Sequence, residues 1–205
     1  QEFNLFANQA QMDIFEQYFY DLNQFLRTPG NSTTHADMVD VLEEKISFFE
    51  VTSDLILTTA NQVSSGNLNT LDRFYRLSSV RFRDLILEGV NRKEFRLFPT
   101  SPLAAPTATR PIYMVDTVNN TIQAAGRTFG RLTIDFIQAP TLVNWTYVVV
   151  GEKALYNATA LDAQNFDLHP SEETELVLKI LTLAGFTLKD PNLLQIAAGE
   201  DAKNI

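Results

Sequence analysis

Apolar residues recur every three to four positions from Phe3 to Leu26, which is the spacing of a long helix with one apolar face. Seven aromatic residues lie in this segment: Phe3, Phe6, Phe15, Tyr18, Phe19, Tyr20 and Phe25. Ordinary packing inside one subunit is one interpretation of these aromatic residues. The alternative is that part of the helix packs against a second subunit, since aromatic side chains are favoured anchors at protein interfaces.

A second helix is predicted directly after the first. The residues from Thr28 to Asn31 should end the first helix, because they include Pro29 and Gly30. Thr34 followed by Asp37 is typical of a capping box at a helix start. The expected inner face comprises Met38, Val41, Leu42, Lys45, Ile46 and Phe49. Because the connection is short, we expect an antiparallel helical hairpin.

Beyond Val51 the pattern changes to that of strands. The clearest example is Arg131 to Ile137, where Leu132, Ile134 and Phe136 alternate with polar residues and should point inward. The other predicted strands are Leu55 to Thr59, Phe74 to Phe82, Ile112 to Val115, Thr121 to Gln123, Trp145 to Val150 and Ala154 to Tyr156. In Phe74 to Phe82 the apolar residues do not alternate cleanly, and Ala124-Ala125-Gly126 replaces the apolar continuation expected after Gln123.

Helical signals return on both sides of these strands. Asn91 to Leu97 predicts a short helical turn. Pro170 and Ser171 open a longer helix with glutamates in its first turn, and Gly185 should end it. A final helix is expected from Asn192 to Ala198.

Four prolines, Pro99, Pro102, Pro106 and Pro111, fall between Phe98 and Met114. Proline fixes φ and lacks a backbone donor, so this segment should be extended and largely unpaired. It is either a surface crossover within one subunit or a bridge to a neighbouring subunit.

The order of these elements predicts an α+β protein in three parts. Residues 1–50 form the N-terminal helical hairpin, residues 51–168 form an antiparallel β body with the proline-rich arm at 98–114, and residues 169–205 form C-terminal helices and a tail.

Composition narrows the function. The net charge of -9 argues against general affinity for nucleic acid, which requires clustered Lys and Arg. The absence of cysteine removes disulfides, cysteine-based zinc sites and thiol nucleophiles, and favours folding in a reducing cytoplasm. No apolar run is long enough to cross a bilayer, so we expect no membrane contact.

Catalytic signals are missing from the sequence. His35 and His169 are the only histidines, and each lies beside a predicted helix start, where a surface or capping role is usual. No metal-binding, nucleophile or phosphate-loop motif occurs. We therefore predict a protein that is not an enzyme, with no catalytic, cofactor-binding or metal-binding residues.

Charge is unevenly placed along the chain. Residues 1–50 are mainly acidic, residues 73–96 are rich in arginine, and the chain is acidic again beyond Gly151. Ordinary pairing on a solvated surface is one interpretation. In another, acidic and basic faces meet between neighbouring copies, and in a third the basic stretch contacts nucleic acid inside a channel.

Five blocks resemble a known family when they are taken in order. They read ANQAQMDIFEQYFYDLNQFL, LDRFYRLSSVRF, NRKEFRLFPTSPLAAPTATRPIYM, RLTIDFIQAPTLVNWTYVVV and NFDLHPSEETELVLKILTLAGF. This set is similar to structural virion proteins of tailed bacteriophages that infect gut Bacteroidetes, the crAss-like group. The resemblance implies a structural ring or neck protein of the head-to-tail connector, with no catalytic residues.

The resemblance also implies partners and a location. We expect a homo-oligomeric ring, a dodecamer, that contacts the portal and other ring or tail proteins, with non-specific contact to packaged DNA as an option. The chain would fold in the bacterial host cytoplasm and reside in the virion. Residues expected at the assembly interface are Phe6, Phe15, Phe19, Arg73, Arg76, Arg81, Arg83, Pro102, Pro106 and Pro111. Alternatives are a capsid-associated protein, a tail-fibre adaptor, or a host-glycan-binding module that uses Trp145.

Overall fold

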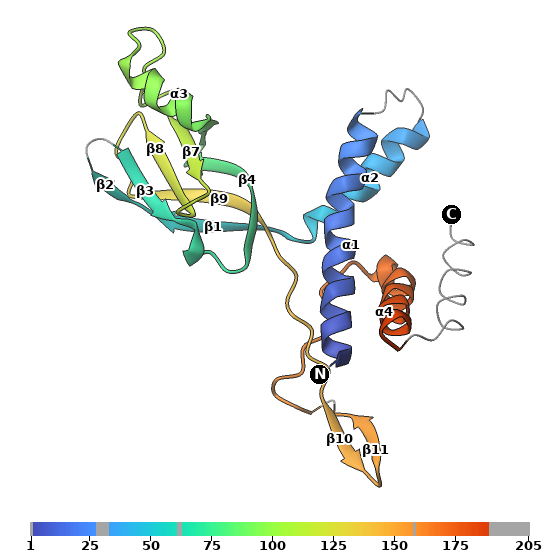
Figure 1. The fold of residues 1–205 in the computed structure, drawn as a ribbon. Helices are drawn as coiled ribbons and strands as arrows, with labels where there is room; N and C mark the ends of the chain where they lie inside the picture. The colour runs from blue at the N-terminus through green and yellow to red at the C-terminus, as the bar shows by residue number, and fades with distance from the viewer. Residues whose placement is uncertain (1, 28–32, 61–62, 158, 189–205) are drawn as a thin grey trace. The chain divides into compact units, whose positions relative to one another are not determined.

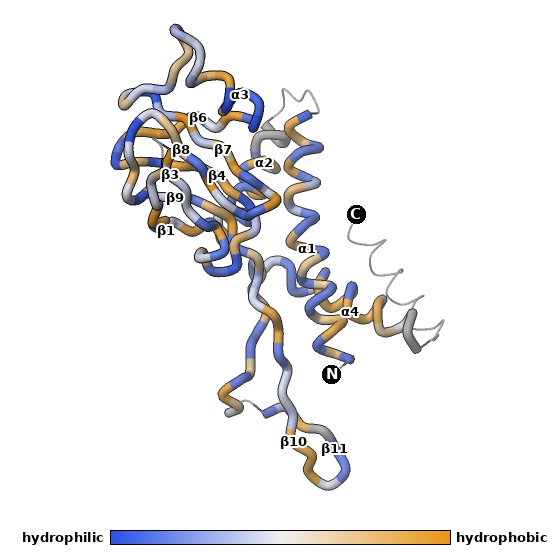
Figure 2. The backbone as a smooth tube through the Cα atoms, turned by 60° about the vertical axis from the view of Figure 1, so that its left-hand side comes forward, coloured by the Kyte–Doolittle hydropathy of each residue, from blue (hydrophilic) through white to orange (hydrophobic). Residues whose placement is uncertain are grey.

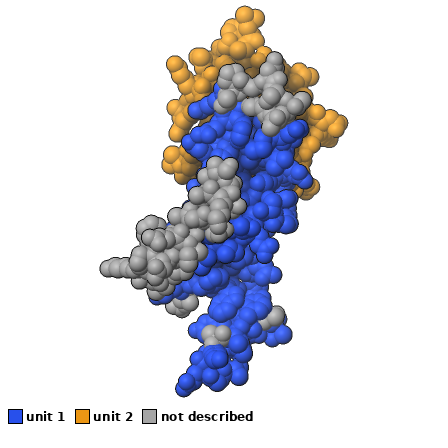
Figure 3. Space-filling model, turned by 90° about the vertical axis from the view of Figure 1, so that its right-hand side faces the viewer, with its two compact units in different colours: residues 1–48, 140–205 blue, residues 49–139 orange. Residues whose placement is uncertain are grey.

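The protein belongs to the α+β class, as the sequence predicts. A computed structural model describes residues 2–27, 33–60, 63–157 and 159–188 (Figure 1). The chain forms two compact units, which Figure 3 distinguishes by colour: unit 1 comprises residues 1–48 and 140–205, and unit 2 comprises residues 49–139. This division differs from the three expected parts, because residues 140–168 group with the helices of unit 1.

Three helices form the main body of unit 1. They are α1 (Glu2–Arg27), α2 (Thr33–Ser47) and α4 (Glu173–Leu188), and both α2 and α4 pack against α1. Figure 1 shows that α2 runs back along α1, which confirms the predicted antiparallel pair. A short helix, η3 (Pro170–Glu172), precedes α4 and is capped by the His169 side chain, which accepts a hydrogen bond from the Ser171 amide.

Some helical details differ from the expectation. On α2, Leu42 is buried, but Met38 and Val41 are each 45% exposed, so the buried face is narrower than predicted. Helix α4 continues past Gly185 to Leu188. The predicted stop at residues 28–31 and the predicted helix at 192–198 lie outside the described residues, and so does the Thr34 side chain of the expected capping box.

A ladder of side-chain amides on α1 holds the extended segment 141–145. Asn4 accepts a hydrogen bond from the Trp145 amide at 2.9 Å. Asn8 binds both backbone groups of Val143, at 2.6 Å and 3.1 Å. One turn further on, buried Gln11 donates to the Thr141 carbonyl at 2.7 Å and accepts from the Asp167 amide at 2.8 Å. This amide ladder explains why residues 140–168 belong to unit 1.

Two sheets that share one core form unit 2. The first has the order β1-β9-β4-β5 and the second has the order β2-β3-β8-β7-β6. All pairs are antiparallel except β6 with β7, which are parallel. The strands are β1 (Glu50–Ile56), β2 (Thr58–Ala60), β3 (Val63–Asn67), β4 (Phe74–Phe82), β5 (Leu85–Ile86), β6 (Glu88–Gly89), β7 (Ile112–Asp116), β8 (Thr121–Ala125) and β9 (Arg131–Gln138). A 3-10 turn, η1 (Leu68–Thr70), connects β3 towards β4.

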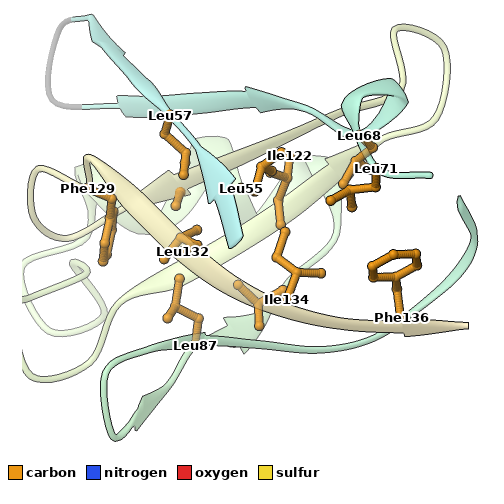
Figure 4. Close-up of a cluster of buried hydrophobic side chains, with 12 residues drawn as sticks. Leu55, Leu57, Leu68, Leu71, Leu87, Ile122, Phe129, Leu132, Ile134 and Phe136 are labelled. Carbon is orange, nitrogen blue, oxygen red and sulfur yellow. The ribbon is translucent and has the colours of Figure 1, made fainter. Parts of the chain in front are cut away.

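The core of unit 2 lies between these sheets. Leu132, Ile134 and Phe136 of β9 are all buried and point into it (Figure 4), which confirms their predicted inward orientation. Leu55 of the neighbouring strand β1 and Ile122 of β8, in the second sheet, belong to the same cluster. The half-buried residue Phe74 packs against Phe136 at 5.6 Å between ring centroids.

Strand β4 has the predicted bounds, and its register with β9 explains why its apolar residues do not alternate cleanly. Its register against β9 shifts between Phe74 and Arg76 and again between Leu77 and Ser79, as two β-bulges would produce. Each shift adds one residue, so Phe74, Leu77 and Val80 all pack against the same core. The imperfect alternation in the sequence thus reflects bulges and not a weak strand.

Helix α3 (Arg92–Leu97) covers the outer face of the second sheet. Phe95 packs there against Ile112, Met114 and Ala125. Ala124 and Ala125 are consecutive and both buried, and they belong to the core between the sheets and to the cluster under α3, respectively. The unexpected small residues therefore continue β8 and allow close packing on both faces.

The proline-rich segment is less extended than predicted. Phe98–Thr100 forms a 3-10 helix, η2, that contains Pro99, and the Ala105 amide donates to the Ser101 carbonyl at 3.1 Å. Further along, Thr107 and Arg110 exchange two backbone hydrogen bonds. Proline fixes φ without preventing turns, and several amides of this segment, those of Ser101, Ala105, Thr107 and Arg110, find local acceptors.

A separate two-stranded sheet lies in unit 1. Strands β10 (Tyr147–Val150) and β11 (Lys153–Tyr156) pair antiparallel, with Tyr147 opposite Tyr156 and Val148 opposite Leu155. Gly151 and Glu152 form the turn between the two strands, and both have positive φ. Figure 2 shows hydrophobic residues along β10.

Candidate assembly interface

The ten residues expected at an assembly interface are divided between the two units. Phe6, Phe15 and Phe19 lie on α1 in unit 1, whereas the arginines and prolines lie in unit 2. Phe15 is completely buried and packs edge-on against Phe19 at 5.2 Å between centroids. It therefore has no surface to offer a second subunit, whereas Phe6 and Phe19 are half-buried.

Two of the four arginines stabilise unit 2 internally. Arg73 donates to the Ala139 carbonyl at 3.0 Å and to the Gln138 side chain at 3.1 Å, which ties the start of β4 to the end of β9. Arg81 forms an ion pair with Asp135 at 2.7 Å. These two residues were expected at an interface, but within unit 2 the Arg73 guanidinium binds Ala139 and Gln138, and Arg81 binds Asp135 through Nη2.

Asp135 is the centre of a polar network between β1, β4 and β9. Its carboxylate accepts hydrogen bonds from Thr52 at 2.7 Å, Ser79 at 2.5 Å and Arg81 at 2.7 Å. Burial raises the pKa of Asp135, but the hydrogen bonds from Ser79, Thr52 and Arg81 outweigh this effect, so its pKa is lower than the ordinary value. The carboxylate is thus held ionised by the strands around it.

The other two arginines are exposed. Arg76 lies on the solvent side of β4, and the Arg83 guanidinium lies 5.4 Å from the ring centroid of Phe82. Arg127 approaches the same ring at 4.4 Å. Cation-π contacts hold the Arg83 and Arg127 side chains over the Phe82 ring. Because they are exposed, Arg76 and Arg83 are candidates for contact with a partner.

The three prolines differ in the same way. Pro111 is fully buried, and a Cβ added at Gly126 would lie only 3.0 Å from the Pro111 Cα, so it cannot contact a partner. Pro102 is exposed. Pro106 is half-buried and lines a hollow of about 570 Å³ together with Pro99 and the end of β8. The segment packs partly onto its own sheet.

The most exposed apolar element was not among the expected interface residues. All six large apolar side chains of the β10–β11 hairpin are exposed: Tyr147, Val148, Val149, Val150, Leu155 and Tyr156. Cross-strand pairing places Tyr147 and Tyr156 on one face and Val148 and Leu155 on the other. The sequence feature that could have indicated this exposed hairpin is the run Tyr147 to Val150, in which no polar residue alternates with the apolar ones.

An aromatic cluster joins this hairpin to α1. Half-buried Trp145 stacks on Tyr147 and on Tyr156, with centroid distances of 5.6 Å and 6.3 Å, and the Phe3 ring meets it edge-on at 5.6 Å. Beside the cluster is a hollow of about 920 Å³, lined also by Asn157 and Asp162. The cluster fixes the base of the hairpin and leaves its apolar strands uncovered.

Comparison with known proteins gives no independent identification: no family model matches the chain and no curated protein is similar to it. Within residues 2–27, 33–60, 63–157 and 159–188, no group of three or more His, Cys, Asp or Glu side chains is arranged to hold a metal ion. Of the helices in the same ranges, none combines the length and hydrophobicity needed to span a bilayer.

Proposed function

We propose that this chain is a non-enzymatic structural protein of the virion of a crAss-like bacteriophage, and that it forms a ring in the neck or tail around the portal and DNA channel axis. The ordered sequence blocks motivate this assignment. Copies of the chain are the main partners in this proposal, with the portal and neighbouring ring or tail proteins above and below.

The observation that carries the proposal is the exposed β10–β11 hairpin. An isolated two-stranded hairpin is marginally stable in water, and an apolar strand with free edges promotes uncontrolled association. Here each face carries exposed apolar side chains, which are 43% to 65% exposed, and Lys153 is the one charged residue of the two strands. A protein that functions inside a permanent assembly can retain such an element, because a neighbour covers it.

The first experiment is assembly of the purified chain, alone and with portal, followed by light scattering and negative-stain microscopy. Rings are expected. Val148→Thr with Val150→Thr keeps the β-branched shape but makes both positions polar, so this variant should assemble poorly. The matched control is Val118→Thr with Val177→Thr, which changes two exposed valines elsewhere, at 83% and 50% exposure. Wild-type protein that stays monomeric under all conditions and is absent from particles contradicts the proposal.

Copy number separates a ring from another structural role in the same particle. Quantitative mass spectrometry of virions should give a number equal to that of the portal subunits. A value in the hundreds would instead indicate a capsid-associated protein, and a value matching the fibres would indicate a tail-fibre adaptor.

A host-glycan-binding module is the second candidate, because the hollow beside Trp145 combines aromatic rings with amide and carboxylate groups. Against it, Tyr147 and Tyr156 stack on Trp145, and Asn4 and Asn144 bind each other at 2.9 Å. Glycan-array binding that disappears in Trp145→Ala would favour this module over the ring subunit.

A further inference from the structure

Charge is segregated between the two units. Unit 1 has 17 acidic and 6 basic residues, a net charge of -11, whereas unit 2 has 8 acidic and 10 basic residues, a net charge of +2. The acidic segments at the two ends of the chain thus fold into one unit, and the arginine-rich middle forms the other. Opposite charge on different units favours contacts between unlike units of separate copies.

The acidic side of this pair is most regular on α2. Asp37, Asp40, Val41 and Glu44 follow the spacing of one helical face and are all exposed. Val41 lies within this stripe at 45% exposure. Among the described residues, none of the three carboxylates has a hydrogen bond or an ion pair. We call these four residues the acidic stripe.

The basic side is most regular on α3. Arg92, Lys93, Arg96 and Leu97 are all exposed, and with Thr100 they line a hollow of about 540 Å³. Leu97 is 57% exposed between cationic side chains. Within the described part of the chain, no ion pair or hydrogen bond engages these three cationic groups, although Arg92 acts at longer range on Asp116. We call these four residues the basic stripe.

The two stripes match in pattern, and each has a pair of like charges four residues apart. From Asp40 to Glu44 and from Arg92 to Arg96, each helix rises about 6 Å. Each stripe also carries one exposed aliphatic side chain among three like charges. We infer that the acidic stripe of one copy packs against the basic stripe of the next, with Val41 directed at the hollow beside Leu97. This contact rests on the proposed ring and specifies how its neighbours recognise each other.

The observations favour a protein partner over nucleic acid for the basic stripe. Three cations in one short helix offer few phosphate contacts, and the exposed Leu97 among them suits an apolar side chain better than a phosphate. Binding of labelled double-stranded DNA by the isolated protein, lost in Lys93→Glu with Arg96→Glu, would overturn the inference in favour of DNA.

Charge reversal tests the contact directly. Variant A carries Asp40→Lys and Glu44→Lys, and variant B carries Lys93→Glu and Arg96→Glu. In each variant alone, like charges face each other at every contact. The protein concentration at which half of the chains are assembled should therefore be at least about tenfold higher than for wild type. Because A and B are complementary at both contacts, their equimolar mixture should assemble at the wild-type concentration into alternating rings. The control, Glu16→Lys with Glu173→Lys, has the same charge change as A at exposed sites elsewhere and should assemble normally.

The outcomes separate this contact from the proposed function. Rings that form normally from A or from B overturn the contact and leave the ring proposal standing. Failure of the mixture, with recovery in a chain carrying all four substitutions, would mean that the stripes pair within one chain, which also overturns the inference. Wild-type chains that never form rings, with or without portal, refute the proposed function itself.

Discussion

The amide ladder of unit 1 makes Gln11 a sensitive test of how α1 holds residues 140–168. Gln11 is 2% exposed, and its side chain bonds the Thr141 carbonyl and the Asp167 amide. Gln11→Leu preserves the approximate volume but removes both hydrogen bonds. Two half-buried backbone groups then lose their partners, which costs about 1 to 1.5 kcal/mol each, or about 2 to 3 kcal/mol in total.

Urea unfolding can measure this loss selectively. The chain contains one tryptophan, Trp145, which lies at the end of the ladder, so its fluorescence reports on unit 1. With a urea dependence of about 2 kcal/mol per molar, the midpoint should fall by about 1 to 1.5 M. Far-UV circular dichroism of the β signal should show an unchanged transition for unit 2.

The control is Gln17→Leu. Gln17 also bonds a side chain one helical turn away, Asp21 at 2.7 Å, but this pair is exposed. Its loss should change the free energy of unfolding by less than about 0.5 kcal/mol. If Gln11→Leu moves the fluorescence midpoint no further than Gln17→Leu does, the ladder does not stabilise unit 1 and the reasoning is refuted.

Three further substitutions test other features. The Tyr18 hydroxyl is buried without a hydrogen-bond partner among the described residues, so Tyr18→Phe should raise the unfolding free energy of unit 1 by up to about 1 kcal/mol; a decrease would reveal a hidden partner. Since hydrogen bonding lowers the pKa of Asp135 despite burial, its carboxylate stabilises unit 2 above about pH 4 and this contribution is lost as the pH falls. Asp135→Asn should therefore show a flatter dependence of stability on pH between about 5 and 2, and an unchanged slope would contradict this. Gly126 has φ of 115°, and an added Cβ would lie 2.7 Å from the Thr107 carbonyl oxygen. Gly126→Ala should therefore lower the free energy of unfolding by about 2 kcal/mol or more. Gly130→Ala, where the added Cβ would have open space, should not lower it.

Local patterns in the sequence predicted most elements of the fold. Strand β9 was predicted with its inner face because Leu132, Ile134 and Phe136 alternate strictly with polar residues. Strand β4 was located but its faces were not, since the bulges depend on the register with β9 and no local pattern encodes a partner strand. The amide ladder was missed for a similar reason: Asn4, Asn8 and Gln11 bind a segment more than 100 residues away.

The candidate interface was harder to predict than the fold. Residue type alone suggested Phe15, Arg81 and Pro111, but Phe15 and Pro111 are buried and Arg81 is engaged in its own unit. Residue type does not show whether a side chain is buried or bonded within its own unit, so composition cannot separate these uses from an interface. Exposure of the β10–β11 hairpin depends on whether another part of the chain covers it, which is a property of the tertiary structure.

Folding turns the acidic, basic and acidic order of the chain into two units of opposite sign, and this limits how copies can associate. A contact between two copies of unit 1 would bring charges of -11 together, so contacts between unlike units are favoured. Because the acidic and basic stripes lie on α2 and α3, which belong to different units, each copy has one surface of each kind. If two copies bind each other through both stripes, association stops at a dimer. If the acidic stripe of one copy binds one neighbour and its basic stripe binds another, association continues until a ring closes. The mass of the alternating A and B assembly decides between these geometries, and a mass of two chains would argue against the ring.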